Sequence, residues 1–343
     1  MTLVLILLLA APAEAMDFTA PEAPDRVAGV VEEKADSFGE GLWNVIRFGI
    51  EQLDGSLREA MGVGLAVAAA VMVCTLIREI CADLSAKAVE LACSVAVAGL
   101  LLEPSASLIG LGTDTARELS EYGKLLLPVL TGAMAAQGGV TASASLYAGT
   151  ALFDSLLSAF LTRLMVPMLW LFLALAMGNS ALKENLLGKM RDFIGWGMGW
   201  VLKIVLYLFT GYMTVTGVVS GSADAFAVRA AKAAISTAVP VVGGILSDAS
   251  EAVLITAGTL GSAAGIYGML TVLALFAGPF VRLGVQYGLL KGVGALCASF
   301  DGGDGASGLV NDFATAMGLV LGMVGTQTVL LMISMLCLMK GVG

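Results

Sequence analysis

Six charged side chains stand inside long apolar stretches of the sequence, where they are best placed to do chemistry or to line a path. They are Glu90, Asp154, Arg163, Lys203, Asp248 and Arg282. An ionisable group inside a bilayer is costly, so it usually faces a protein interior and often marks a pathway. Asp154 and Asp248 are the hardest to explain as surface charges. The basic side chains could instead snorkel to an interface, which is the interpretation we favour for Arg282, and Glu90 could lie at headgroup level.

The chemistry open to these residues is narrow. The chain has no histidine, which excludes Ser-His-Asp and Cys-His catalysis, histidine metal sites and imidazole relays. Two aspartates in a membrane raise the idea of an aspartyl protease, whose carboxylates share a proton at close range. The resembling run Asp301-Gly302-Gly303-Asp304 lies in a polar loop, however, and there is no P-loop. We predict a protein that is not an enzyme, with no catalytic residue, cofactor or metal.

Two short segments match at a fixed spacing and suggest a duplication. They are residues 127–132 (Leu-Pro-Val-Leu-Thr-Gly) and 239–244 (Val-Pro-Val-Val-Gly-Gly), whose prolines are 240 − 128 = 112 positions apart. The same register aligns Gly132 with Gly244, Gly149 with Gly261, and Pro167 with Pro279. Such Pro/Gly-interrupted units at equivalent positions often build membrane passageways.

Each matching segment predicts a broken hairpin. The apolar piece around Pro128, residues 125–136, is too short to cross a bilayer and indicates a re-entrant or interfacial hairpin. Gly132 and the pair Gly243-Gly244 would permit the backbone turns. Asp248 follows the second break, beginning at Pro240, and could either cap the next helix or face a hydrated path. The pathway candidates are therefore Pro128, Gly132, Asp154, Arg163, Lys203, Pro240, Gly243, Gly244 and Asp248.

The composition requires a membrane protein to position these residues. Hydrophobic residues make up 58% and charged residues 13% of the chain, against roughly half and a quarter in soluble domains. Stretches such as 61–77 and 313–339 carry no charge, and about 20 apolar residues suffice to cross a hydrocarbon core. We expect an all-α, multispan membrane protein with two internal repeats.

The N-terminus has a different character. Residues 1–15 hold a short apolar run, a proline and a small-x-small site, which together predict a cleaved signal peptide, with a retained first helix as the alternative. Residues 16–58 should then be extracytoplasmic, with an amphipathic helix at about 35–57 lying near the membrane surface. This segment holds nine acidic and four basic residues, which argues against nucleic-acid binding.

The remaining chain, residues 59–343, is predicted to be the polytopic membrane domain. Expected crossings are about 60–77, 88–102, 145–177, 194–219, 252–298 and 313–339. The repeat units would cover about 82–193 and 194–305, followed by the final span. The basic cluster at 183–191 marks the expected cytoplasmic face, and the acidic region 103–121 is expected to be extracytoplasmic. Six crossings make the repeats parallel, whereas loops at Pro167 and Pro279 would give eight crossings and inverted repeats.

The second half of the chain resembles stage III sporulation protein AE of endospore-forming bacteria. The resemblance rests on Gly221-Ser222-Ala223-Asp224, on residues 228–232 (Val-Arg-Ala-Ala-Lys), and above all on the block from Val239 to Ala249. Leu125 to Leu130 and Val166-Pro167 also fit, and the similarity extends over nearly the whole mature chain.

The resemblance implies a multi-pass protein of the mother-cell membrane around the forespore. It would be a non-enzymatic component of the channel or secretion-like complex that joins the two cells and supports endospore development. Implied partners are the other stage III A proteins, including an ATPase and ring-forming subunits, and a forespore-side protein across the intermembrane space. The repeat and the buried charges alone leave an alternative, which is an autonomous secondary transporter with its site at the paired broken helices.

Overall fold

The computed structural model describes residues 20–31, 38–80, 86–136, 140–182, 185–215, 263–301 and 306–340, and these form a helical bundle. The helices are α2 (Phe38–Ile80), α3 (Ala86–Ala136), α4 (Val140–Phe160), α5 (Val166–Leu182), α6 (Asn185–Val215), α9 (Ala263–Asp301) and α10 (Ala306–Lys340). A five-residue π-helical turn, η2 (Leu161–Met165), joins α4 to α5. Within the described ranges every regular element is helical, as the sequence predicted.

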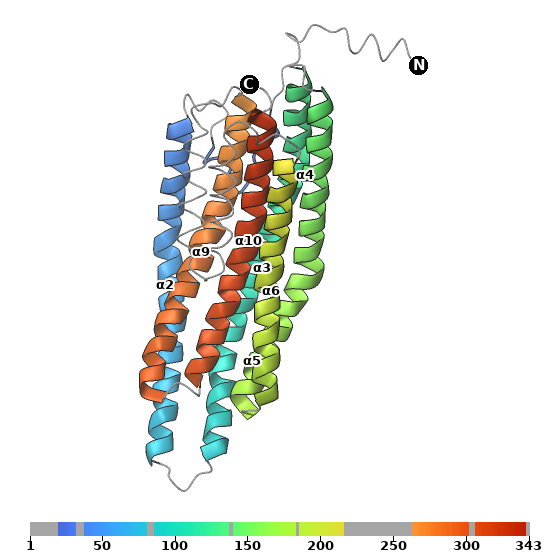
Figure 1. Ribbon diagram of the computed structural model, residues 1–343. Helices are drawn as coiled ribbons and strands as arrows, with labels where there is room; N and C mark the ends of the chain where they lie inside the picture. The colour runs from blue at the N-terminus through green and yellow to red at the C-terminus, as the bar shows by residue number, and fades with distance from the viewer. Residues whose placement is uncertain are drawn as a thin grey trace.

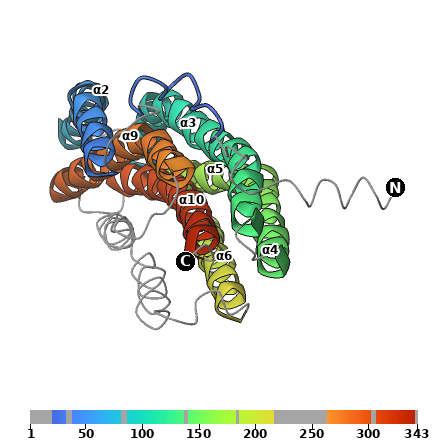
Figure 2. The same ribbon diagram turned by 90° about the horizontal axis from the view of Figure 1, so that it is seen from above.

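The chain runs alternately down and up the bundle, with α4, η2 and α5 together forming one descending run (Figure 1). The ends of α2, α5 and α9 lie with the starts of α3, α6 and α10 at the lower end of the view, which we call the hairpin end. Seen from above, α10 lies in the middle of the bundle with α9, α3 and α6 around it (Figure 2). Most side chains of α10 are accordingly buried, including Phe313, Val320 and Leu330.

Six candidate membrane spans occur within the described part of the chain: Phe38–Ile80, Ala88–Ala135, Leu146–Leu182, Asn185–Phe209, Ala264–Ser299 and Ala306–Met339. This agrees with the predicted multispan character. Many of the outward-facing side chains are large and apolar, such as Leu65, Leu171 and Trp196. Because such side chains are costly to expose to water, they fit a surface that faces lipid.

The outer helices are longer than one crossing requires. Helix α2 has 43 residues and α3 has 51, lengths of about 65 and 77 Å at roughly 1.5 Å per residue. A hydrocarbon core is only about 30 Å thick, so both helices must tilt or project beyond it. The predicted amphipathic helix at 35–57 is the first half of α2, continuous with the span, and so it is not a separate surface helix. The predicted domain boundary at 58/59 falls within this helix.

Close packing of α2, α3 and α10 depends on glycines that face neighbouring helices. On α2, Gly41 lies against Leu270 of α9, and Gly64 lies against Leu289. On α3, Gly112 and Gly123 lie against Val320 and Leu331 of α10. Small residues let the backbones approach, so dispersion contacts hold the helices together.

The predicted hairpin at residues 125–136 is wrong. Pro128 lies inside α3, which continues from Ala86 to Ala136 and also contains Pro104. An internal proline removes one backbone hydrogen bond and costs about 3 kcal/mol. Burial of Leu126, Leu127 and Leu130 offsets this cost at about 1.5–3 kcal/mol per side chain. The acidic region 103–121 also belongs to α3, so the predicted crossing at about 88–102 is part of a longer helix.

The structure has a π-helical turn just before Pro167, and the chain continues as a helix on both sides of it. Pro167 has no N–H for the carbonyl of Arg163, and the preceding turn is π-helical, with the Val166 N–H bonded to the Leu161 carbonyl. Pro279 lies inside the continuous helix α9, so neither proline forms a loop. The two prolines stand on chain segments that run in the same direction (Figure 1), but the duplication itself stays a prediction.

The N-terminal segment 20–31 packs on the upper half of the bundle. The Ala23 N–H donates to the Tyr267 hydroxyl of α9 at 3.1 Å, and Arg26 forms an ion pair with Glu118 of α3 at 3.0 Å. Val27 and Val31 are buried. The segment is thereby fixed to two helices at the end opposite the hairpin end.

Candidate functional site

A buried polar cluster lies where α3, α4 and α10 meet. Asp154 of α4 is only 2% exposed, although it lies in a helix of membrane-span character. Ser120 of α3 donates a hydrogen bond to its Oδ2 at 2.8 Å, and the Gln327 amide of α10 donates to Oδ1 at 2.5 Å. Helices α3, α4 and α10 thus each direct one polar side chain to the same point. We call these three residues the Asp154 cluster.

The packing around the cluster is apolar and aromatic. Phe153, the neighbour of Asp154, contacts Phe209 of α6 edge to face with ring centroids 5.4 Å apart. Gln327 is completely buried, and its Oε1 atom has no hydrogen-bond partner among the described atoms. An unsatisfied buried carbonyl oxygen is unusual and marks a strained or functional position. The cluster is therefore a polar point inside an otherwise apolar helix interface.

The other predicted site residues do not join this cluster. Pro128 is an exposed residue of α3, and Gly132 lies half-buried near the end of the same helix. Arg163 is exposed on η2, and Lys203 is half-buried on α6. Both basic positions fit snorkelling side chains better than a shared buried site.

Four predicted site residues lie outside the described part of the chain. They are Pro240, Gly243, Gly244 and Asp248. Their proposed role in a second broken hairpin is untested and stays a prediction.

Sequence reasoning singled out Asp154 but missed both of its partners. Ser120 stands among the charged residues of the region 103–121, outside every predicted crossing. Gln327 is an amide within the charge-free stretch 313–339. A buried amide needs hydrogen-bond partners, and this requirement is the signal that points to Gln327.

A second polar network lies toward the hairpin end. Arg191 of α6 forms an ion pair with Asp312 of α10 at 2.6 Å and with its neighbour Asp192 at 2.7 Å. Lys291 of α9 donates to the Asn311 side chain on α10. These contacts join the starts of α6 and α10 to the last turns of α9. Sequence analysis identified Arg191 only as part of the basic cluster that marks the cytoplasmic face. It did not predict Asp312 as the partner of Arg191.

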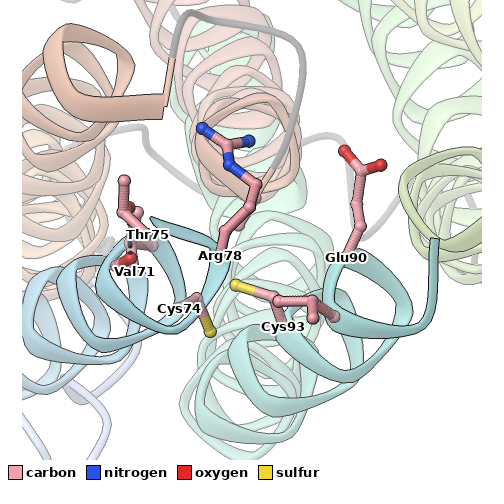
Figure 3. A pocket seen from close by; sticks show the side chains of 8 residues that line it. Val71, Cys74, Thr75, Arg78, Glu90 and Cys93 are labelled. Carbon is pink, nitrogen blue, oxygen red and sulfur yellow. Dashed lines mark hydrogen bonds between the residues drawn. The ribbon is translucent and has the colours of Figure 1, made fainter. Parts of the chain in front are cut away.

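A small pocket opens between α2 and α3 at the hairpin end (Figure 3). Arg78 of α2 and Glu90 of α3 both point away from the two helices on the same side, and Cys74 and Cys93 lie between the helices. Val71, Thr75, Val89 and Ala306 complete the lining. No group of three or more acidic, cysteine or histidine side chains suited to a metal occurs within the described ranges.

The arrangement offers one buried ionisable group with neutral hydrogen-bond donors and, toward the hairpin end, a charged network that joins α6, α9 and α10. In the Asp154 cluster the Ser120 hydroxyl donates directly to the carboxylate. The geometry supports ion or proton binding and helix fastening more directly than bond-making chemistry.

The chain is similar to a known protein family. The family described as "Stage III sporulation protein AE" matches residues 38–342. Stage III sporulation protein AE of Bacillus subtilis (strain 168) is 20% identical over 175 residues, which cover 51% of this chain and 44% of that relative's length. No solved structure matches. Because the family match extends through all the described helices, this chain belongs to the stage III sporulation protein AE family.

Proposed function

We propose that this chain is a non-enzymatic, multi-pass component of a channel or secretion-like complex between mother cell and forespore. It would reside in the mother-cell membrane around the forespore and support development of the endospore. The family match over residues 38–342 is the observation that carries this proposal. Six candidate spans within the described part support the membrane location.

The bundle suits a structural subunit better than an independent catalyst. Its helices are held by close glycine contacts and by ion pairs near helix ends, and the described part of the chain buries two carboxylates, Asp154 and Asp312. In this proposal the partners are the other stage III A proteins, among them an ATPase and ring-forming subunits, together with a forespore-side protein. An ATPase partner would supply the energy, because the sequence has no P-loop.

The proposal is tested by deleting the gene in the sporulating host and following development after engulfment. We expect engulfment to finish and the forespore then to stop developing, with rescue by the wild-type gene supplied in trans. Normal spores in the deletion strain would contradict a required role. A deletion in a different sporulation gene, not rescued by this one, controls for general effects on sporulation.

The partners are tested by purifying a tagged chain from sporulating cells after mild cross-linking. We expect an ATPase and extracytoplasmic ring-forming proteins to copurify. A tagged, unrelated multispan protein expressed at the same stage is the control for membrane carry-over. Recovery of the chain without these partners, while the tagged gene still supports sporulation, would contradict the complex.

An autonomous secondary transporter is the second candidate, and the buried carboxylate of Asp154 is the observation that favours it. The two candidates differ in what the chain does alone. Purified chain in sealed vesicles should give no solute uptake driven by a pH or sodium gradient if it works as a complex subunit. Gradient-driven uptake by the isolated chain would favour the transporter.

A further inference from the structure

We propose that Asp154 is a proton-binding site, with its carboxyl group protonated at neutral pH while the bundle is packed. The inference concerns the chemistry of the Asp154 cluster and does not depend on the role of the chain in sporulation.

Burial without a cationic partner is the first reason. Asp154 is 2% exposed, and the two side chains that donate hydrogen bonds to it, Ser120 and Gln327, are neutral. A buried carboxylate normally requires a paired cation, because its charge is otherwise removed from water without compensation. A proton neutralises the group within the same volume.

The neighbouring helices supply no buried counter-charge. On α3, Lys124 stands one turn beyond Ser120, but its side chain is exposed. The stretch of α10 around Gln327 is uncharged from residue 313 to residue 339. The part of α6 nearest to α4 contributes Phe209 and Tyr212, and on α4 itself Asp154 is the only charged residue.

The hydrogen-bond geometry accommodates the proton. A neutral carboxyl group has one O–H donor and a carbonyl acceptor. Oδ1 would still accept from the Gln327 amide, while the proton on Oδ2 would be donated to the Ser120 hydroxyl oxygen. The Ser120 hydroxyl hydrogen would then turn to a backbone carbonyl one turn earlier, as it does for Thr113, Thr115 and Thr131 of the same helix.

A metal cation fits the cluster less well. The cluster provides a carboxylate, one hydroxyl and one amide oxygen, and both carboxylate oxygens already accept hydrogen bonds from protein donors. A hard cation takes about six oxygen ligands. Even with both carboxylate oxygens, the Ser120 hydroxyl and the unpartnered Oε1 of Gln327, the cluster has fewer oxygens than such a shell requires.

Loss of the proton would place a charge at the junction of α3, α4 and α10. The charge would have two neutral donors and no buried cation, so the packed bundle would become less favourable.

The first test is infrared spectroscopy of the purified full chain in lipid nanodiscs at neutral pH. We expect a carbonyl stretching band from a protonated carboxylic acid, which shifts on H/D exchange and is absent in Asp154→Asn. Asp114→Asn removes an exposed acid on α3 and should leave the band in place. Absence of the band from the wild type, or its survival in Asp154→Asn, would overturn the proposal.

The second test is thermal unfolding of the purified full chain at neutral pH. Asparagine places a carbonyl acceptor and an NH2 donor where the protonated carboxyl group has its two oxygens. We expect Asp154→Asn to unfold at the same temperature as the wild type or at a higher one, because asparagine makes the same contacts without taking up a proton. The control Asp114→Asn should unfold within about 3 °C of the wild type. An Asp154→Asn protein that is much less stable than the wild type would contradict a protonated Asp154. Stabilisation of the wild type by sodium, at fixed pH and absent from Asp154→Asn, would also overturn the proposal in favour of a cation site.

Discussion

At the scale of single residues, the ion pair between Arg191 and Asp312 is a largely buried charged contact between α6 and α10. The two side chains are 19% and 11% exposed, whereas those of Arg47 and Glu51 on the surface of α2 are 73% and 63% exposed. Screening by water weakens exposed pairs, and burial makes an orphaned partner expensive. The first pair should therefore matter for stability and the second should not.

We expect Asp312→Asn to destabilise the protein by about 1–3 kcal/mol, because Arg191 would lose the carboxylate across the helix interface and keep only Asp192. The matched control is Glu51→Gln, which should change stability by less than about 0.5 kcal/mol. Chemical or thermal unfolding of both purified proteins in the same detergent measures the difference. Equal effects of the two changes would contradict the assigned importance of burial.

At the scale of elements, helix α3 meets α10 along a face that has no room for additional atoms. A Cβ at Gly112 would collide with a methyl group of Val320, a fully buried residue of α10. Val320 is branched at Cβ and has few rotamers, so it cannot move aside easily. Gly110, two residues earlier on α3, is exposed and has open space around it.

Gly112→Ala should lower stability by about 1–3 kcal/mol through overpacking. Gly110→Ala on the same helix should be neutral or stabilise by up to about 1 kcal/mol, because alanine favours the helix. The double change Gly112→Ala with Val320→Ala should recover part of the loss if the clash is its cause. Thermal unfolding of the four proteins tests this, and a Gly112→Ala protein as stable as Gly110→Ala would refute the close α3–α10 contact.

The continuity of α3 through Pro128 has its own consequence. Alanine at this position restores an N–H that can donate to the carbonyl of Lys124. We expect Pro128→Ala to stabilise the chain by up to about 3 kcal/mol and to retain sporulation in a complementation assay. Stabilisation accompanied by loss of sporulation would show that a bend or a freed carbonyl at Pro128 is required for function.

At the scale of the whole molecule, the up-and-down order places the chain's connections at two opposite ends. The start of α6 lies at the hairpin end, and the segment 20–31 packs toward the other end through Tyr267 near the start of α9. The positive-inside bias of residues 183–191 predicts that the hairpin end is the cytoplasmic one. The N-terminal segment should then be extracytoplasmic.

This topology predicts the labelling pattern of single cysteines placed in a variant without native cysteines. Glu22→Cys should react with a membrane-impermeant reagent in intact cells, and Asn185→Cys should react only after permeabilisation. Both positions are exposed, so access to the side chain does not limit either. Labelling of position 185 but not position 22 in intact cells would invert the assigned orientation.

The sequence by itself determined the membrane class, the all-helical fold and the family. Apolar runs of crossing length have one stable form in lipid, because a helix satisfies its own backbone groups. For the same reason Asp154 stood out as a group that could not face lipid. These conclusions depend on the residue types along one segment at a time.

Tertiary structure alone decided where helices continue and which polar groups meet. Pro128 and Pro279 read locally as breaks, yet packing against neighbouring helices carries α3 and α9 through them. Ser120 and Gln327 reach Asp154 from 34 and 173 residues away, a pairing that no local pattern encodes. Local energetics favour or disfavour a helix, but contacts between distant segments determine its final length and give a buried charge its partners.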